Sequence, residues 1–148
     1  MEEKLLKEII DKINSNISIE KLGVFEKKIS NKIDTYSPKL KEIEKIVVFY
    51  QDDKSIKKIN FVSKKPLFSI EYLKKELGDF KTGYSFRDDI TKISFETPSN
   101  VIKQITTTKD NRLEISQEKI MQITPQGEIF EYKPSDKIFT SICFILKY

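Results

Sequence analysis

Residues 46–63 read IVVFYQDDKSIKKINFVS, and this stretch decides the fold class. A β-branched and aromatic run at 46–50 is followed by a polar turn at 51–55. Beyond the turn, positions 59, 61 and 63 face one way while positions 60 and 62 face the other, because side chains alternate along a strand. The stretch therefore predicts a β-hairpin, which Lys-Lys-Pro at 64–66 closes.

Helical patterns precede this hairpin. Within residues 2–15, apolar side chains at positions 5, 6, 9, 10 and 13 recur at helical spacing, which predicts an amphipathic helix. Residues 18–23 are typical of a short capped turn. Phe25, Ile29 and Ile33 then recur every four residues, so we expect a second helix that reaches about Tyr36 and ends before Pro38.

After the hairpin, one more helix is expected before the chain becomes all strand. Ser69 is its N-cap, and Gly78 is its C-terminal stop. The last apolar run, at 138–146, is the richest in the chain and predicts a central strand. Further strands are expected at 84–86, 93–96 and 101–108, one or two within 112–123, and one at 128–132.

Together these elements predict an α+β fold in a single domain, residues 1–148. Two or three helices in the N-terminal half would pack on one face of a mostly antiparallel, meander-like sheet. The length of 148 residues suits one domain, and ten Phe and six Tyr can form its core. Short turns and the lack of strand–helix alternation after residue 80 argue against a parallel sheet.

The charged residues point away from nucleic acid and membrane. The net charge is +4, but only Arg87 and Arg112 are arginines among 27 basic residues. Lysines alternate with acidic residues along the chain, which favours a solvated surface over a nucleic-acid patch. The N-terminus is charged, and no apolar run approaches the ~20 residues of a membrane-spanning helix. We therefore expect a cytoplasmic protein.

Two stretches of the chain are similar to each other. Residues 18–25 resemble residues 69–80, and the order helix signal, strand, turn, strand follows in both. A duplicated helix-plus-hairpin unit, about 18–65 and 69–109, would explain the similarity. The alternative is chance similarity in a chain rich in lysine and isoleucine.

The second of these stretches carries a resemblance to known folds. From Ser69 to about Thr108, a capped helix ending in Leu77-Gly78 is followed by a tyrosine-containing strand, a turn and a Phe-bearing strand. This order resembles the helix-then-sheet units of the BamE and beta-lactamase-inhibitor-protein type, which are binding folds without catalysis. The whole chain is similar to small bacterial toxin-immunity proteins. These resemblances imply a binding function and supply no site residues.

The parts needed for catalysis are scarce. The chain has no histidine, one cysteine and four scattered glycines, so we expect no metal site, no cofactor and no phosphate-binding loop. Cys143 lies among apolar neighbours and is expected to fill the core. Asp52-Asp53 and Asp88-Asp89 fall at expected hairpin turns, where aspartate is favoured for backbone reasons.

Two turns hold the candidate contacts for a protein partner. The first turn combines aromatic and charged groups of the kind enriched at binding hot spots, and it consists of Tyr84, Phe86, Arg87, Asp88 and Asp89. The alternative for this turn is that Phe86 is a core residue beside a solvated turn. The second candidate turn carries Asp52 and Asp53.

Two functions remain open on this basis. The first is a non-enzymatic protein-binding module, in its most specific form a bacterial immunity protein that neutralises a cognate toxin. The second is a small enzyme or ligand-binding domain that uses carboxylates and tyrosine in a sheet-lined pocket. The sequence leaves the partner, its binding face and the oligomeric state open.

Overall fold

The structure is a computed structural model that describes residues 2–15, 18–116 and 118–147. Two α-helices, one short 3-10 helix and eleven strands make up this part of the chain. In chain order they are α1 (Glu2–Asn14), η1 (Ile19–Lys21), β1 (Gly23–Ser30), β2 (Ile33–Pro38), β3 (Lys45–Tyr50), β4 (Ile56–Val62), α2 (Ile70–Leu77), β5 (Phe80–Ser85), β6 (Ile90–Glu96), β7 (Ile102–Asp110), β8 (Arg112–Ile115), β9 (Ile120–Ile123), β10 (Ile129–Tyr132) and β11 (Ser141–Leu146).

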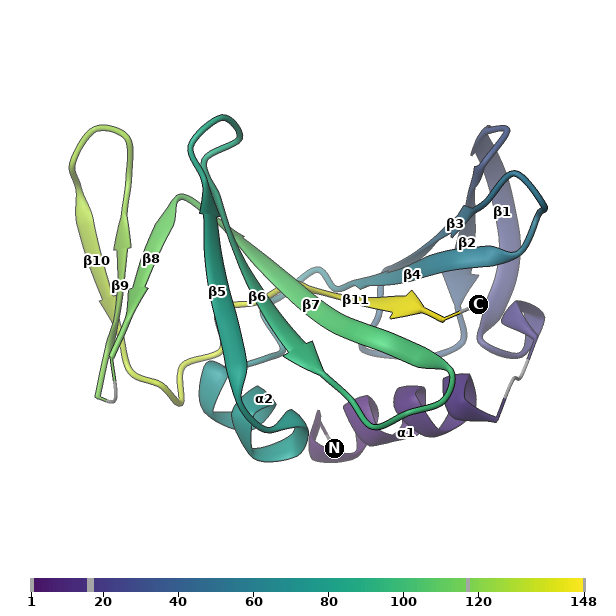
Figure 1. The fold of residues 1–148 in the computed structure, drawn as a ribbon, viewed down its shortest axis with the longest axis horizontal. Coiled ribbons are helices and arrows are strands. Elements are labelled where there is room, and N and C mark those ends of the chain that lie inside the picture. The colour runs from purple at the N-terminus through teal and green to yellow at the C-terminus, as the bar shows by residue number, and fades with distance from the viewer. Residues whose placement is uncertain (1, 16–17, 117, 148) are drawn as a thin grey trace.

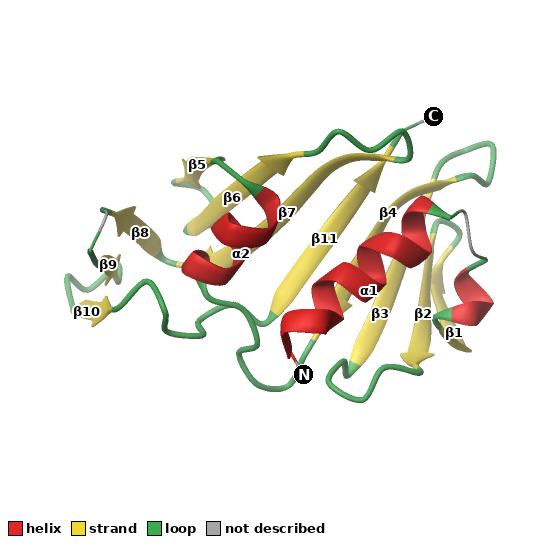
Figure 2. Cartoon of the chain, turned by 90° about the horizontal axis from the view of Figure 1, so that it is seen from below, coloured by secondary structure: helices red, strands yellow, loops and turns green. Residues whose placement is uncertain are grey.

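Eight of the strands form one antiparallel sheet. Its order is β1-β2-β3-β4-β11-β7-β6-β5, while β8, β9 and β10 form a separate three-stranded sheet. The large sheet is curved, so that its two sides rise away from α1 and α2 (Figure 1). Figure 2 looks from the helix side and shows α1 and α2 in front of the strands. The predicted combination of helices with a mostly antiparallel sheet is confirmed.

The strand order repeats one arrangement twice. A helix followed by the meander β1-β2-β3-β4 forms the first half, and a helix followed by β5, β6, β7 and β11 forms the second. The last strands of the two halves, β4 and β11, pair with each other at the centre. The three-stranded sheet is inserted between β7 and β11. Duplication of the chain itself stays a prediction, and its proposed units at 18–65 and 69–109 differ from these halves.

Alternate residues of the large sheet join the helices in one core. Leu6, Ile9 and Leu73 of the helices are fully buried, as are Phe61 and Phe144 of the two central strands. The rings of Phe61 and Phe144 meet edge to face with centroids 5.6 Å apart. Such a pair adds stability beyond the apolar area that it buries. The predicted alternation in β4 and the central position of β11 are confirmed.

The small sheet approaches the large sheet on the core side. The Thr91 hydroxyl accepts a hydrogen bond from the backbone N–H of Leu113, at 2.8 Å. Thr91 of β6 has the same orientation as the buried Ile93 and Phe95, because alternate residues share a face. β8 therefore lies against the core side of the large sheet at β6.

The predicted helix over residues 25–36 is wrong. This segment forms β1, a two-residue turn and β2. Phe25 and Ile29 are 53% and 52% exposed, so their spacing of four does not mark a buried helical stripe. Register shifts occur at Glu26 and Ile29, and the extra residues break the alternation that would have identified a strand. The α2 helix, by contrast, is confirmed: the Ser69 hydroxyl accepts the N–H of Tyr72 at 3.0 Å.

We predict that Phe144→Ala lowers the free energy of unfolding by about 3–5 kcal/mol, because it removes a fully buried ring beside Phe61. The matched control is Ile145→Ala, the next residue of β11, which points to the opposite face and is partly exposed. Its loss should be less than half as large. Urea unfolding of the two variants measures both values, and equal losses would contradict the assignment of the core side.

Candidate functional site

The face of the large sheet that points away from the core is the candidate site, and we call it the open face. Its members alternate with the buried residues of each strand, as the strand pairing shows. None of the helices or strands that the structure describes covers this side (Figure 1). Its central residues are Val47, Phe49, Lys58, Asn60, Val62, Lys92, Ser94, Gln104, Thr106, Ser141, Cys143 and Ile145.

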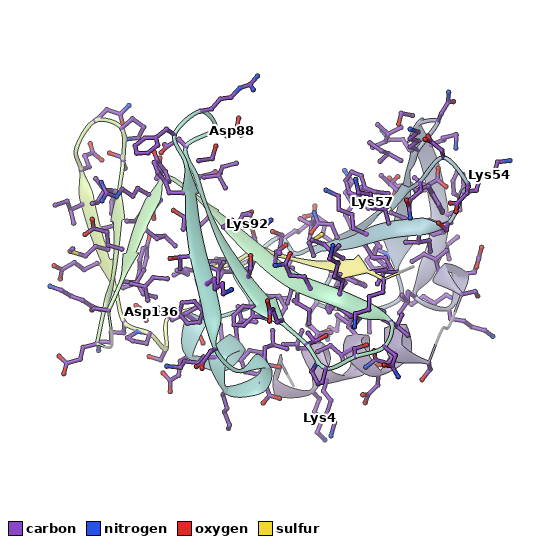
Figure 3. The ribbon with its side chains drawn as sticks, viewed as in Figure 1. Lys4, Lys54, Lys57, Asp88, Lys92 and Asp136 are labelled. Atoms are coloured by element: carbon purple, nitrogen blue, oxygen red, sulfur yellow. The ribbon has the colours of Figure 1, made fainter. Side chains whose placement is uncertain are left out.

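Lysines gather on the open face. Five follow from the paired positions of their strands, and two more lie at bulges, where an extra residue turns toward the side of its neighbour. These bulges fall at Lys57 in β4 and at Lys103 in β7. Figure 3 shows Lys57 and Lys92 on this side of the sheet, opposite Lys4 of α1. The seven lysines of the open face are Lys27, Lys45, Lys57, Lys58, Lys81, Lys92 and Lys103.

The open face carries the positive excess of the chain. Its acidic residues are Glu26, at a bulge of β1, and Glu96, at the end of β6. Seven of 27 basic residues and two of 23 acidic residues thus lie there, which leaves 20 basic and 21 acidic residues elsewhere. Within the described residues, none of the seven lysines belongs to an ion pair. Their charge is therefore available to a partner.

Two lysines, Lys58 and Lys92, lie near the centre of this face. The ammonium of Lys58 lies 4.4 Å from the ring centroid of Phe49, in a cation–π contact. Burial raises the pKa of the Cys143 thiol, while the charge of Lys58, a hydrogen bond with Thr106 and the charge of Lys92 act to lower it. Lys58 of β4 and Lys92 of β6 lie on either side of β11 and β7, the two strands between them. Cys143 lies on the open face opposite Asn60 and is only partly buried, so the expectation that it fills the core is wrong.

The apolar part of the open face lies beside these lysines. Val47, Val62 and Ile145 are each partly exposed rather than buried. They belong to β3, β4 and β11, which are neighbours in the sheet. At the outer strand β1, Val24 is 61% exposed on the same face. Aliphatic side chains next to cations offer both desolvation and charge to a bound surface.

The first sequence-predicted turn rises at one side of the open face. It joins β5 to β6, and Asp88 marks its tip in Figure 3. The Tyr84 hydroxyl donates to the Asp89 carboxylate at 2.5 Å, and this bond raises the pKa of Tyr84. Phe86 is 86% exposed and packs edge to face on Tyr84, with centroids 4.8 Å apart. The alternative that Phe86 is a core residue is therefore wrong, and Arg87 beside it is also exposed.

The second predicted turn lies at the other side. It joins β3 to β4, and Lys54 marks it in Figure 3. The Asp53 carboxylate accepts the backbone N–H of Ser55 at 2.9 Å and its hydroxyl at 2.6 Å, and these bonds lower the pKa of Asp53. Asp52 pairs with Lys32 at 2.5 Å. The two turns are thus on opposite sides of the molecule, and the structure does not bring their residues together.

A hollow of about 380 Å³ lies near the β3–β4 turn, on the other side of the sheet from the open face. Tyr50, Asp34 and Asp52 line it, together with lysines. Burial and hydrogen bonds to Tyr36 and Asp34 raise the pKa of Tyr50 above its usual range. The ammonium of Lys28 lies 3.5 Å from the Asp34 carboxylate. This hollow combines the tyrosine and carboxylates that the alternative function requires.

Among the described residues, no group of three or more Cys, Asp or Glu side chains is arranged to hold a metal ion. Nor does either described helix have the length and apolar character needed to cross a membrane. Comparison with known proteins found no matching family model, no similar curated protein and no similar solved structure.

The gathering of lysines is the feature that sequence reasoning missed. Read along the chain, Lys27, Lys58 and Lys92 stand far apart, and Lys27 and Lys92 have acidic residues close to them in the sequence. Strand pairing puts them on one face and sends most acidic residues to turns, helices and the opposite side. The sequence did contain one signal: polar and apolar residues alternate in β4, so that Lys58 and Asn60 face away from Ile59 and Phe61.

We predict that the Cys143 thiol titrates above the ordinary cysteine range and that Lys58→Gln raises its pKa further, because a cation that stabilises the thiolate is removed. The thiolate is the reactive form, so alkylation should be slow at neutral pH, slower still in the variant, and faster as pH rises. The pH profile of iodoacetamide alkylation measures this shift. Lys4→Gln on α1 is the control and should leave the profile unchanged.

Proposed function

We propose that this chain is a non-enzymatic protein-binding module that binds its partner on the open face. In its most specific form, the proposal is a bacterial immunity protein that neutralises a cognate toxin in the cytoplasm. We also infer that α1 and α2 form a single supporting layer on the core side, so that the sheet acts as a shaped platform. The observation that carries the proposal is the uncovered eight-stranded face with its unpaired lysines.

The composition of the open face supports protein binding. Polar uncharged side chains such as Asn60 and Gln104 lie between the lysines and the partly exposed Val62 and Ile145. An interface needs an apolar centre that a partner can desolvate and a polar rim that pairs with it. The rim is supplied here by the β3–β4 and β5–β6 turns, which rise on opposite sides of the face (Figure 1).

The exposed Phe86 supports a role for the β5–β6 turn in this proposal. The Phe86 ring is 86% exposed, so it is accessible to a partner, and its edge contact with Tyr84 restricts its position. Tyr84 is in turn fixed by Asp89, whose backbone has a left-handed φ of 51°. The ring is therefore preorganised for contact, which lowers the entropy cost of binding.

A second candidate function rests on the hollow lined by Tyr50 and Asp34. A small enzyme or ligand-binding domain would use this hollow rather than the open face. Its support is the raised pKa of Tyr50 and the nearby Asp34 and Asp52 carboxylates. Tyr50→Phe separates the two functions, because it changes the hollow and leaves every residue of the open face in place.

We predict that Asn60→Trp abolishes partner binding, because it places a bulky ring at the centre of the open face. The assay co-expresses the chain with the product of the neighbouring gene in its source genome and measures growth and copurification. The wild-type chain should restore growth and copurify with that product. Gln126→Trp in the exposed β9–β10 turn is the matched control and should behave like wild type.

Two results would contradict this proposal. One is a chain that neither protects growth nor copurifies with its neighbour's product. The other is equal loss of binding in Asn60→Trp and Gln126→Trp. Thermal unfolding of both variants checks that each is folded. Loss of protection in Tyr50→Phe with retained protection in Asn60→Trp would favour the second candidate function.

A further inference from the structure

We propose that the partner meets the open face with an acidic protein surface, whose carboxylates lie between Lys58 of β4 and Lys92 of β6. This inference rests on the proposed function and gives the chemistry of the partner. The proposed function does not specify the charge of the partner, and this inference does. The following steps give the reasons for an acidic one.

The first reason is the charge of the open face. Seven lysines and two glutamates give it an excess of five positive charges, while the remainder of the chain is nearly neutral. A surface of one sign attracts partners of the other sign and raises their rate of association. A partner with a basic surface would be repelled by this face.

The second reason is the placement of the two central lysines. Lys58 of β4 is held over Phe49 at 4.4 Å, and Lys92 of β6 lies on the same face of the sheet. Neither ammonium is in an ion pair among the described residues. Two cations on one face without a counter-charge give a positive potential over β11 and β7, the strands between them. A carboxylate placed there would be stabilised by both.

The third reason distinguishes a protein from nucleic acid. The open face contains no arginine, since Arg87 lies in the β5–β6 turn and Arg112 in β8. Its aromatic residue, Phe49, has one face covered by Lys58 and is poorly placed for base stacking. Val47, Val62 and Ile145 beside the lysines match aliphatic side chains of a protein surface, whereas a phosphate backbone offers them nothing. Carboxylates interspersed with aliphatic groups fit this face better.

The test measures binding of a short fluorescent peptide of glutamate and leucine to the full chain by anisotropy. We expect saturable binding that weakens as salt is raised, because added salt screens charge. The double variant Lys58→Glu/Lys92→Glu should bind at least about tenfold more weakly. Lys4→Glu/Lys7→Glu on the exposed side of α1 makes the same change in net charge and should bind like wild type.

Three results would overturn the inference. One is equal weakening in the two double variants, which would mean that only net charge matters. Another is tighter binding of double-stranded DNA than of the peptide at the same salt concentration, with the same dependence on Lys58 and Lys92. The third is no peptide binding. If Lys58→Glu/Lys92→Glu unfolds, Lys58→Gln/Lys92→Gln replaces it and should still weaken binding.

The neighbouring-gene product separates this inference from the proposed function. If Asn60→Trp abolishes copurification while Lys58→Glu/Lys92→Glu leaves it intact, the open face binds a protein but the acidic contact is wrong. If both abolish copurification and the α1 control does not, both proposals stand. If neither does, the proposed function has failed, whatever the peptide binds.

Discussion

The pairing of β4 with β11 is the contact on which the rest of the molecule depends. Five residue pairs, from Val62 with Ser141 to Lys58 with Ile145, join the two halves of the sheet. On the core side this pairing brings Phe61 against Phe144, and on the open face it puts Lys58 and Asn60 beside Cys143. The buried residues of this strand pair stabilise the fold, and its exposed residues form the centre of the candidate site. The hydrogen bonds between β4 and β11 therefore support both the core and the site.

The sequence predicted the elements whose signals are local. The α1 stripe, the Ser69 cap of α2 and the alternation of β4 each arise within a dozen residues, and all are confirmed. The same reasoning failed at residues 25–36, because the bulges in β1 remove the period of two and leave Phe25, Ile29 and Ile33 at a helical spacing. Tertiary pairing with β2 and β3 decides the conformation there.

The candidate site was harder to predict, since it is a property of pairing rather than of any segment. Aspartates and aromatic residues stood out in the turns, and Phe86 is indeed exposed as a contact residue must be. The lysines did not stand out, because the register between strands and the bulges at Lys57 and Lys103 decide which side each one faces. Neither the register nor a bulge can be predicted from the sequence of one strand alone. The prediction for Cys143 was wrong for a related reason: its four apolar neighbours, Ile142 and residues 144–146, conceal the alternation of the strand.

The insertion of the three-stranded sheet between β7 and β11 has a consequence for how the chain folds during synthesis. β4 is complete by residue 62, but its partner is formed by residues 141–146. Until β11 emerges, β4 and β7 each present an unpaired edge, and an exposed edge can pair with another chain. Contacts between distant segments also form slowly. The nascent protein must therefore keep two half-sheets apart and soluble until its final strand arrives, and it is exposed to aggregation for as long as that strand is missing.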